Sequence, residues 1–206
     1  MFAVTFTANR DSRWLYEILQ FLFNHVEELN QAEFASQFKD FLEKMAVRYA
    51  EERLFTEDGS IRNYGDIPVY AFNFVDYVLW TNRSGLKEKY TSVEFDNFKF
   101  AYRRSIEHWF PQNPNRHDGE CQLPAEFLHF FGNLCIITDS QNSKFGNLNP
   151  SAKYNQWQGI FHRQSLKLQL MAEITSKKDF DWGPDQIKEL ENEIIPMVNE
   201  FIGSRK

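Results

Sequence analysis

The chain has 206 residues, of which 42% are hydrophobic and 25% charged, with only 9 glycines and 7 prolines. This composition excludes a disordered or fibrous protein and suffices for one domain of ordinary size, or two small ones, with a substantial core. No apolar run approaches the roughly 18 residues of a membrane helix, and the N-terminus lacks the pattern of a signal peptide. We therefore expect a cytoplasmic protein without a membrane span.

The formal net charge is -6, which taken alone argues against a nucleic-acid partner. Residues 99–178 nevertheless carry 10 basic and 6 acidic side chains, whereas both flanking segments are acidic. This basic middle allows a phosphate-binding face, although a chance fluctuation of a few charges gives the same distribution. The two cysteines, Cys121 and Cys135, are too few for an all-cysteine zinc site or a disulfide framework, so we interpret both as reduced thiols.

The first half of the chain is predicted to be helical. Apolar residues recur at three- and four-residue steps over residues 12–30 and again over residues 31–52. Residues 68–80 are apolar almost all round, which is typical of a helix at the centre of a helical core.

The second half mixes strands and helices. Aromatic residues alternate with polar ones over residues 94–104, which predicts a strand, and residues 133–138 form a second, short apolar strand. Further along we expect a loop at 111–124, a short helix from about residue 141, and two longer helices at 151–175 and 184–202. The predicted fold class is α+β, mainly α.

Three polar stretches in this half carry the residues typical of a nuclease. They are Glu107-His108 with Pro111 at His-x-x-Pro spacing, Gly132-Asn133-Leu134, and Asn142 with Asn147, followed by Lys153. The order strand, loop, strand, short helix is that of a ββα-metal finger. Such a finger brings a histidine, a carboxylate and an amide to one small site, and phosphodiester hydrolysis uses such a set.

This pattern resembles the HNH nuclease domain at the C-terminal end of GmrSD-type, modification-dependent (type IV) restriction endonucleases. The resemblance is strongest over residues 95–155. It implies a helical bundle with an embedded ββα-metal finger, which we divide into a helical subdomain at 1–92, a nuclease core at 93–155 and C-terminal helices at 156–206. It also implies a metal-dependent DNA endonuclease with Mg²⁺ or Mn²⁺ as the cofactor.

The resemblance further implies roles for individual residues. His108 is expected to be the general base that activates water, and Asn133 to hold the loop that orients it. Glu107 and Asn142 are expected to bind the metal. Four more residues are expected to contact substrate or to support the site: Asn147, Lys153, Arg104 and Lys144. His117 and His129 lie nearby, and we interpret them as loop residues rather than substrate contacts.

Two alternative functions remain open. The nucleotide-handling motif of the family's N-terminal domain is absent, so we expect that domain, or a partner chain, to supply nucleotide control and target recognition. One alternative function is a non-catalytic interaction module with a degenerate nuclease-like finger. Another is cleavage of RNA or single strands, which the sequence does not separate from cleavage of duplex DNA.

Overall fold

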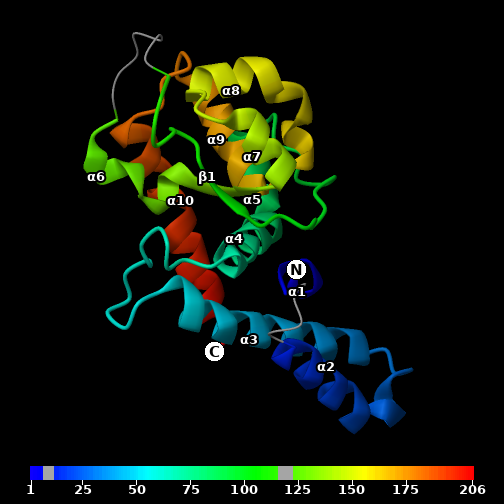
Figure 1. Cartoon of the computed structure of the whole chain (residues 1–206). Coiled ribbons are helices and arrows are strands. Elements are labelled where there is room, and N and C mark those ends of the chain that lie inside the picture. Colours follow the sequence, from blue (N-terminus) through cyan, green and yellow to red (C-terminus); the bar gives the residue numbers. More distant parts are fainter. Residues whose placement is uncertain (7–11, 116–122) are drawn as a thin grey trace.

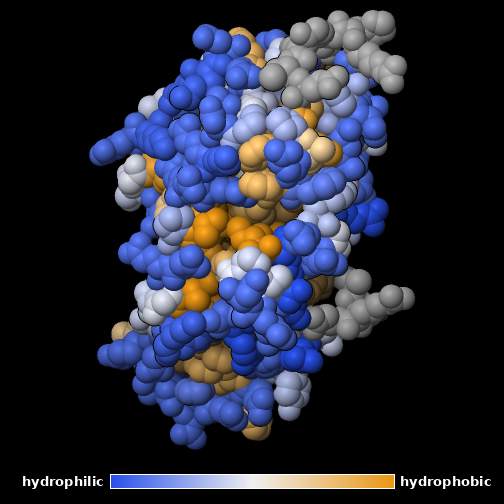
Figure 2. All heavy atoms as spheres, turned by 90° about the vertical axis from the view of Figure 1, so that its left-hand side faces the viewer, coloured by the Kyte–Doolittle hydropathy of each residue, from blue (hydrophilic) through white to orange (hydrophobic). Residues whose placement is uncertain are grey.

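A computed structural model describes residues 1–6, 12–115 and 123–206 of the chain. The described part is mainly helical and contains one small antiparallel sheet of two strands (Figure 1). In these ranges no helix combines the length and the hydropathy that crossing a bilayer requires. The face on the side of α6 and α10 is largely hydrophilic, with apolar residues gathered in its middle (Figure 2).

The N-terminal part forms an arm. After the short helix α1 (Phe2–Thr5), helix α2 (Arg13–Asn24) and a 3-10 turn, η1 (Val26–Glu28), lead into the long helix α3 (Phe34–Leu54). Helix α2 lies along α3 and projects with it from the rest of the molecule (Figure 1). The predicted helix at 12–30 is therefore shorter than expected, and the next helix begins and ends slightly later than expected.

The core is built around α4 (Val69–Thr81), which packs against α3, α9 (Leu166–Lys177) and α10 (Pro184–Gly203). Nine residues of α4 are buried, so the prediction of a central helix over 68–80 is confirmed. Helix α5 (Arg83–Lys89) follows α4 directly. The prediction of a last helix over 184–202 is confirmed by α10.

The sheet pairs β1 (Ser105–His108) with β2 (Leu134–Ile137) in an antiparallel register that places His108 opposite Leu134. The chain between them forms the short helix α6 (Ala125–Leu128) and the 3-10 turn η2 (Phe131–Asn133). After β2 come α7 (Asp139–Phe145), α8 (Pro150–Trp157) and the 3-10 helix η3 (Gln158–Arg163). Thr138 caps α7 by accepting the Gln141 backbone N–H.

Two predicted elements are wrong. Residues 94–104 form no strand; their alternating aromatic residues pack as a loop, with Phe95 buried and Phe100 against Tyr77 of α4. The predicted helix at 151–175 is broken into α8, η3 and α9, because Ser165 caps a new helix through the Leu168 backbone N–H. The predicted loop at 111–124 lies partly outside the described residues.

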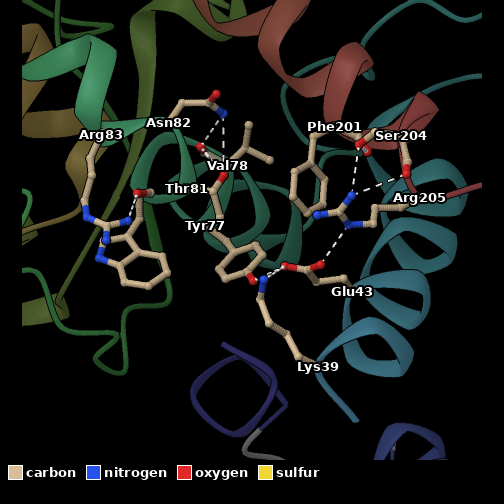
Figure 3. A network of polar contacts seen from close by, with 11 residues as sticks. Lys39, Glu43, Tyr77, Val78, Thr81, Asn82, Arg83, Phe201, Ser204 and Arg205 are labelled. Carbon is tan, nitrogen blue, oxygen red and sulfur yellow. Dashed lines mark hydrogen bonds and ion pairs between the residues drawn. The ribbon is translucent and has the colours of Figure 1, made fainter. Parts of the chain in front are cut away.

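A polar network joins the arm to the core (Figure 3). Glu43 on α3 accepts hydrogen bonds from the Tyr77 hydroxyl on α4 and from Arg205 Nε after α10, each at 2.7 Å. Lys39 lies 3.4 Å from the same carboxylate. Because Glu43 is 5% exposed, these contacts fix α3 to the core at the point where the arm begins to project.

Candidate functional site

His108 ends β1, and its ring is enclosed by residues from three separate segments. The ring is 4% exposed, with Nε2 3.0 Å from His129 Nδ1 and Nδ1 3.3 Å from the Gln112 side-chain nitrogen. Tyr64 lies edge-on to His108 at a centroid distance of 4.4 Å and stacks on His129 at 5.0 Å. Burial, with smaller contributions from His129 and Lys153, lowers the pKa of His108 to about 4. His108 is therefore neutral at pH 7.

These contacts select one tautomer of His108. The amide nitrogen of Gln112 can only donate, so His108 Nδ1 accepts and carries the lone pair. His108 Nε2 then carries the proton and donates to His129 Nδ1. The lone pair on Nδ1 points toward Gln112, which is an exposed residue.

Asn133 fixes the chain directly after His108. Its Oδ1 accepts the Phe110 backbone N–H at 2.9 Å and the Trp182 indole N–H at 3.0 Å, and its Nδ2 donates to the Phe110 carbonyl at 3.1 Å. A further bond from Nδ2 reaches the Leu128 carbonyl at 2.9 Å. Asn133 is fully buried, so this amide replaces the ladder hydrogen bonds that the chain loses where β1 ends.

Gly132 is required by a close approach between η2 and α10. A Cβ atom at this position would collide with the backbone carbonyl oxygen of Ile187. The Gly132 backbone N–H also donates to Glu191 at 2.8 Å. The Gly-Asn-Leu stretch thus combines close helix packing with the Asn133 contacts.

Glu107 and His108 point to opposite sides of β1, as neighbours on a strand do. The Glu107 carboxylate lies 2.7 Å from Lys153 Nζ on α8. Lys153 is fully buried and also donates to the carbonyls of His108 and Trp109, at 2.7 and 2.8 Å. Burial raises the pKa of Glu107 and lowers that of Lys153, while their attraction acts against both shifts. Lys153 therefore braces the backbone of His108 and does not reach the surface to contact a phosphate.

A second buried lysine braces the other strand. Lys167 on α9 donates to the carbonyls of Phe131 and Leu134, at the start of β2. Burial lowers its pKa to about 7. Buried ammonium groups thus hold the backbone on both sides of the strand end where His108 lies.

The other predicted site residues lie apart from His108. Asn142 is exposed on α7, and Asn147 is an exposed residue whose carbonyl accepts the Asn115 backbone N–H. Arg104 pairs with Asp139 at the N-terminus of α7, and Lys144 lies over the Trp157 ring at 5.3 Å. The structure does not bring these four side chains into contact with the His108 ring.

The donor types fit a hard divalent cation, although no cluster of three acidic, histidine or cysteine ligands occurs in residues 1–6, 12–115 and 123–206. Lys153 binds only Oε1 of Glu107, and no hydrogen bond from the described part of the chain reaches Oε2. The Asn142 amide likewise has no side-chain hydrogen bond within that part. One carboxylate oxygen and one amide oxygen are thus free of hydrogen bonds within the described residues, but Glu107 points to the other side of β1 from His108, so a shared metal site beside His108 requires the strand end to bend.

Three neighbours of His108 carried little sequence signal. Gln112 directly follows the His-x-x-Pro stretch, and this position is the one sequence signal that could have indicated it. His129 was interpreted as a packed loop residue, but it holds the His108 ring. Tyr64 comes from the loop before α4, far away in the sequence, and no local pattern indicates it. His117 lies outside the described residues.

Comparison with known families gives one match. The model of the family described as GmrSD restriction endonucleases, C-terminal domain, matches residues 61–197. No curated protein and no solved structure matches the chain. The matched range includes the sheet, Tyr64, both buried lysines and all the predicted site residues, and it excludes α2 and α3.

Proposed function

Because the chain belongs to the family of C-terminal domains of GmrSD restriction endonucleases, we propose that it is a metal-dependent HNH-type endonuclease acting on DNA in the cytoplasm. It would form the nuclease portion of a modification-dependent defence system. The observation that supports this most directly is the state of His108. An imidazole that is neutral at pH 7, and whose Nδ1 faces the exposed Gln112 side chain, can take a proton from a water molecule that replaces that side chain.

In the proposed reaction, His108 Nδ1 takes a proton from a water molecule that displaces Gln112 from its hydrogen bond. The oxygen of that water attacks the phosphorus of a phosphodiester, the bond to the 3′ oxygen breaks, and the leaving 3′ oxygen takes up a proton from solvent water. The products carry a 5′-phosphate and a 3′-hydroxyl. His129, through its contact with Nε2, holds the His108 ring in position.

Glu107 Oε2 and Asn142 are the proposed holders of Mg²⁺ or Mn²⁺. Such an ion supplies stabilisation of negative charge at the scissile phosphate and at the leaving oxygen. Lys153 keeps Glu107 in place through Oε1, which leaves its other oxygen for the ion. Asn133 acts on the base indirectly, because it fixes the backbone that follows His108.

Positively charged side chains near the sheet are proposed to contact the DNA backbone. Lys144 is exposed, and Arg104 is 64% exposed although paired with Asp139. Contacts of this kind give salt-dependent affinity without sequence preference. Recognition of the modification would then belong to a separate N-terminal domain or partner chain.

A plasmid nicking assay tests this proposal. The chain and its His108→Ala variant are incubated in Mg²⁺, Mn²⁺ or EDTA with plain and modified plasmids, and with RNA and single-stranded DNA of the same sequence. We expect metal-dependent cutting of plasmid that falls by about 10²- to 10⁴-fold in the variant. Cutting that survives EDTA, or that is equal in the variant, would contradict the proposed mechanism.

Inactivity of the isolated chain would be followed by addition of the N-terminal domain in trans. Rescue by that domain supports a nuclease under its control. Absence of rescue would favour the alternative of a non-catalytic interaction module.

A further inference from the structure

The apolar surface of helix α2 is wider than the part of it that other elements cover. Its polar side chains form one narrow stripe, comprising Arg13, Glu17, Gln20 and Asn24. The remaining positions are apolar, yet none of the 12 residues of α2 is buried. A helix with so wide an apolar surface is ordinarily covered on more than one side.

One seam of α2 is covered by α1 and α3. Trp14, Ile18 and Phe21 recur at steps of four and three residues on this side, and Trp14 stacks on Phe2 of α1 at 6.0 Å. The Phe21 ring stacks on Phe41 at 4.2 Å, and Glu17 forms an ion pair with Arg48 of α3. The position of α2 on the arm is thus set by specific contacts.

A second apolar seam, on the opposite side of α2, is exposed. Its members recur at steps of three, four and three residues, the spacing of coiled-coil core positions. Their exposed fractions are 65% for Tyr16, 56% for Leu19, 79% for Phe23 and 59% for Val26, the last of these in η1. Three exposed apolar side chains in one line on α2, continued by Val26 in the following turn, indicate a helical partner.

The charges at the two ends of this seam identify the partner. Arg13 precedes the seam, and Glu27 and Glu28 end it. None of these three forms an ion pair in the part of the chain that the structure describes. If a second α2 runs antiparallel, Tyr16 lies opposite Val26, Leu19 opposite Phe23, and Arg13 near the two glutamates of the other copy. A parallel arrangement would place like charges together at both ends.

We propose that the exposed seam of α2 is a homodimer interface, in which two copies of this chain pair their α2 helices antiparallel. The interface is self-complementary in both apolar spacing and charge, as a two-fold contact must be. Since a pair of short helices buries an area at the low end for specific interfaces, the dimer should dissociate in the micromolar range. This assembly does not depend on the proposed function, because it is measured without substrate.

Sedimentation equilibrium of the full chain, from low to high micromolar concentration, tests the proposal. We expect a reversible monomer–dimer equilibrium. Combined replacement Leu19→Glu and Phe23→Glu should weaken it by about a hundredfold or more. The control is Tyr102→Glu, because Tyr102 is a 49% exposed aromatic residue far from α2 in the sequence, and it should leave the equilibrium unchanged. Circular dichroism verifies that each variant keeps its helix content.

Charge reversal tests the antiparallel direction. Arg13→Glu should weaken the dimer by about threefold to tenfold at low salt. Adding Glu27→Arg and Glu28→Arg to that variant should restore the original affinity. A chain that stays monomeric at high micromolar concentration, a dimer indifferent to the Leu19 and Phe23 replacements, or a failure of the charge swap to restore affinity would overturn the proposal.

Discussion

Around His108 polar and charged side chains are buried, whereas along α2 large apolar side chains are exposed. Glu107, Asn133, Lys153 and Lys167 are all less than one-tenth exposed, and each is hydrogen-bonded to backbone or to an opposite charge. The seam of α2 has apolar side chains that are more than half exposed. Burial of polar groups and exposure of large apolar side chains both cost free energy unless other interactions offset the cost.

The two regions compensate in different ways. The site uses buried charge to hold a strand end in one conformation, and every contact it needs lies within the chain. The exposed apolar seam of α2 has no covering contact within the described chain, and a second copy of the chain is its proposed partner. The buried polar groups around His108 are thus satisfied by contacts within the described chain, whereas the exposed apolar seam of α2 is not.

The largest effect is expected from breaking the internal compensation at Lys153. Lys153→Met leaves the Glu107 carboxylate buried without its counter-charge and removes the donor from two carbonyls. We expect the free energy of unfolding to fall by about 3–5 kcal/mol, measured by urea denaturation. The double variant with Glu107→Gln should recover part of this loss, because the buried charge is then gone. No recovery would mean that packing, rather than charge, explains the effect.

The next effect concerns the residue that holds the base. His129→Ala should reduce the cleavage rate by about tenfold to a hundredfold, because the His108 ring loses its only side-chain contact at Nε2 within the described residues. The unfolding free energy should change little, since His129 is exposed. His129→Asn, which can still accept a hydrogen bond, is the matched variant and should retain more activity than alanine. Equal rates in the two variants would contradict a positioning role.

The pH dependence of stability gives a third, smaller effect. Between pH 6.5 and 4 the unfolded chain binds a proton at His108 that the folded chain does not, so stability falls as the pH falls through this window. Asp76 acts in the opposite direction, because burial raises its pKa to about 6. The measurement therefore compares the chain with His108→Gln, which should lose about 2 kcal/mol less over the window. Parallel pH curves for the two proteins would be evidence against a low His108 pKa.

The smallest effect is expected on the arm. Leu19→Glu with Phe23→Glu should change the unfolding free energy of the monomer by no more than about 0.5 kcal/mol, because both side chains are exposed. The cleavage rate per monomer should also be unchanged at low concentration. A strong destabilisation of the monomer would show that the seam is covered within the chain, and the contrast between the two regions would fail.

Much of the fold was predictable from periodicity, and part of it was not. The central helix α4 and the last helix α10 were predictable because the apolar pattern of each lies within its own segment. A strand was predicted at residues 94–104 because its aromatic residues alternate with polar ones, but these residues form a loop in which Phe95 is buried and Phe100 contacts Tyr77 of α4. The predicted long helix is interrupted at Ser165, because the side chain of Ser165 accepts the Leu168 backbone N–H and so starts the new helix α9.

The neighbours that the structure places around His108 were only partly indicated by the sequence. The motif pointed to His108, Glu107 and Asn133, because each lies in a short stretch with a distinct pattern. The pairing of Glu107 with Lys153 joins residues 46 positions apart, and only the packing of α8 against the sheet creates it. The same holds for Tyr64, whose contact with His108 depends on how the two halves of the chain pack together.

The most direct test of the account is an NMR titration of the His108 ring with ¹⁵N detection, assigned by comparison with His108→Gln. We expect the His108 ring to be neutral at pH 7, to carry its proton on Nε2 and to titrate near pH 4. A His108 ring that is protonated at pH 7, or that carries its proton on Nδ1, would contradict the assignment of His108 as a pre-arranged general base.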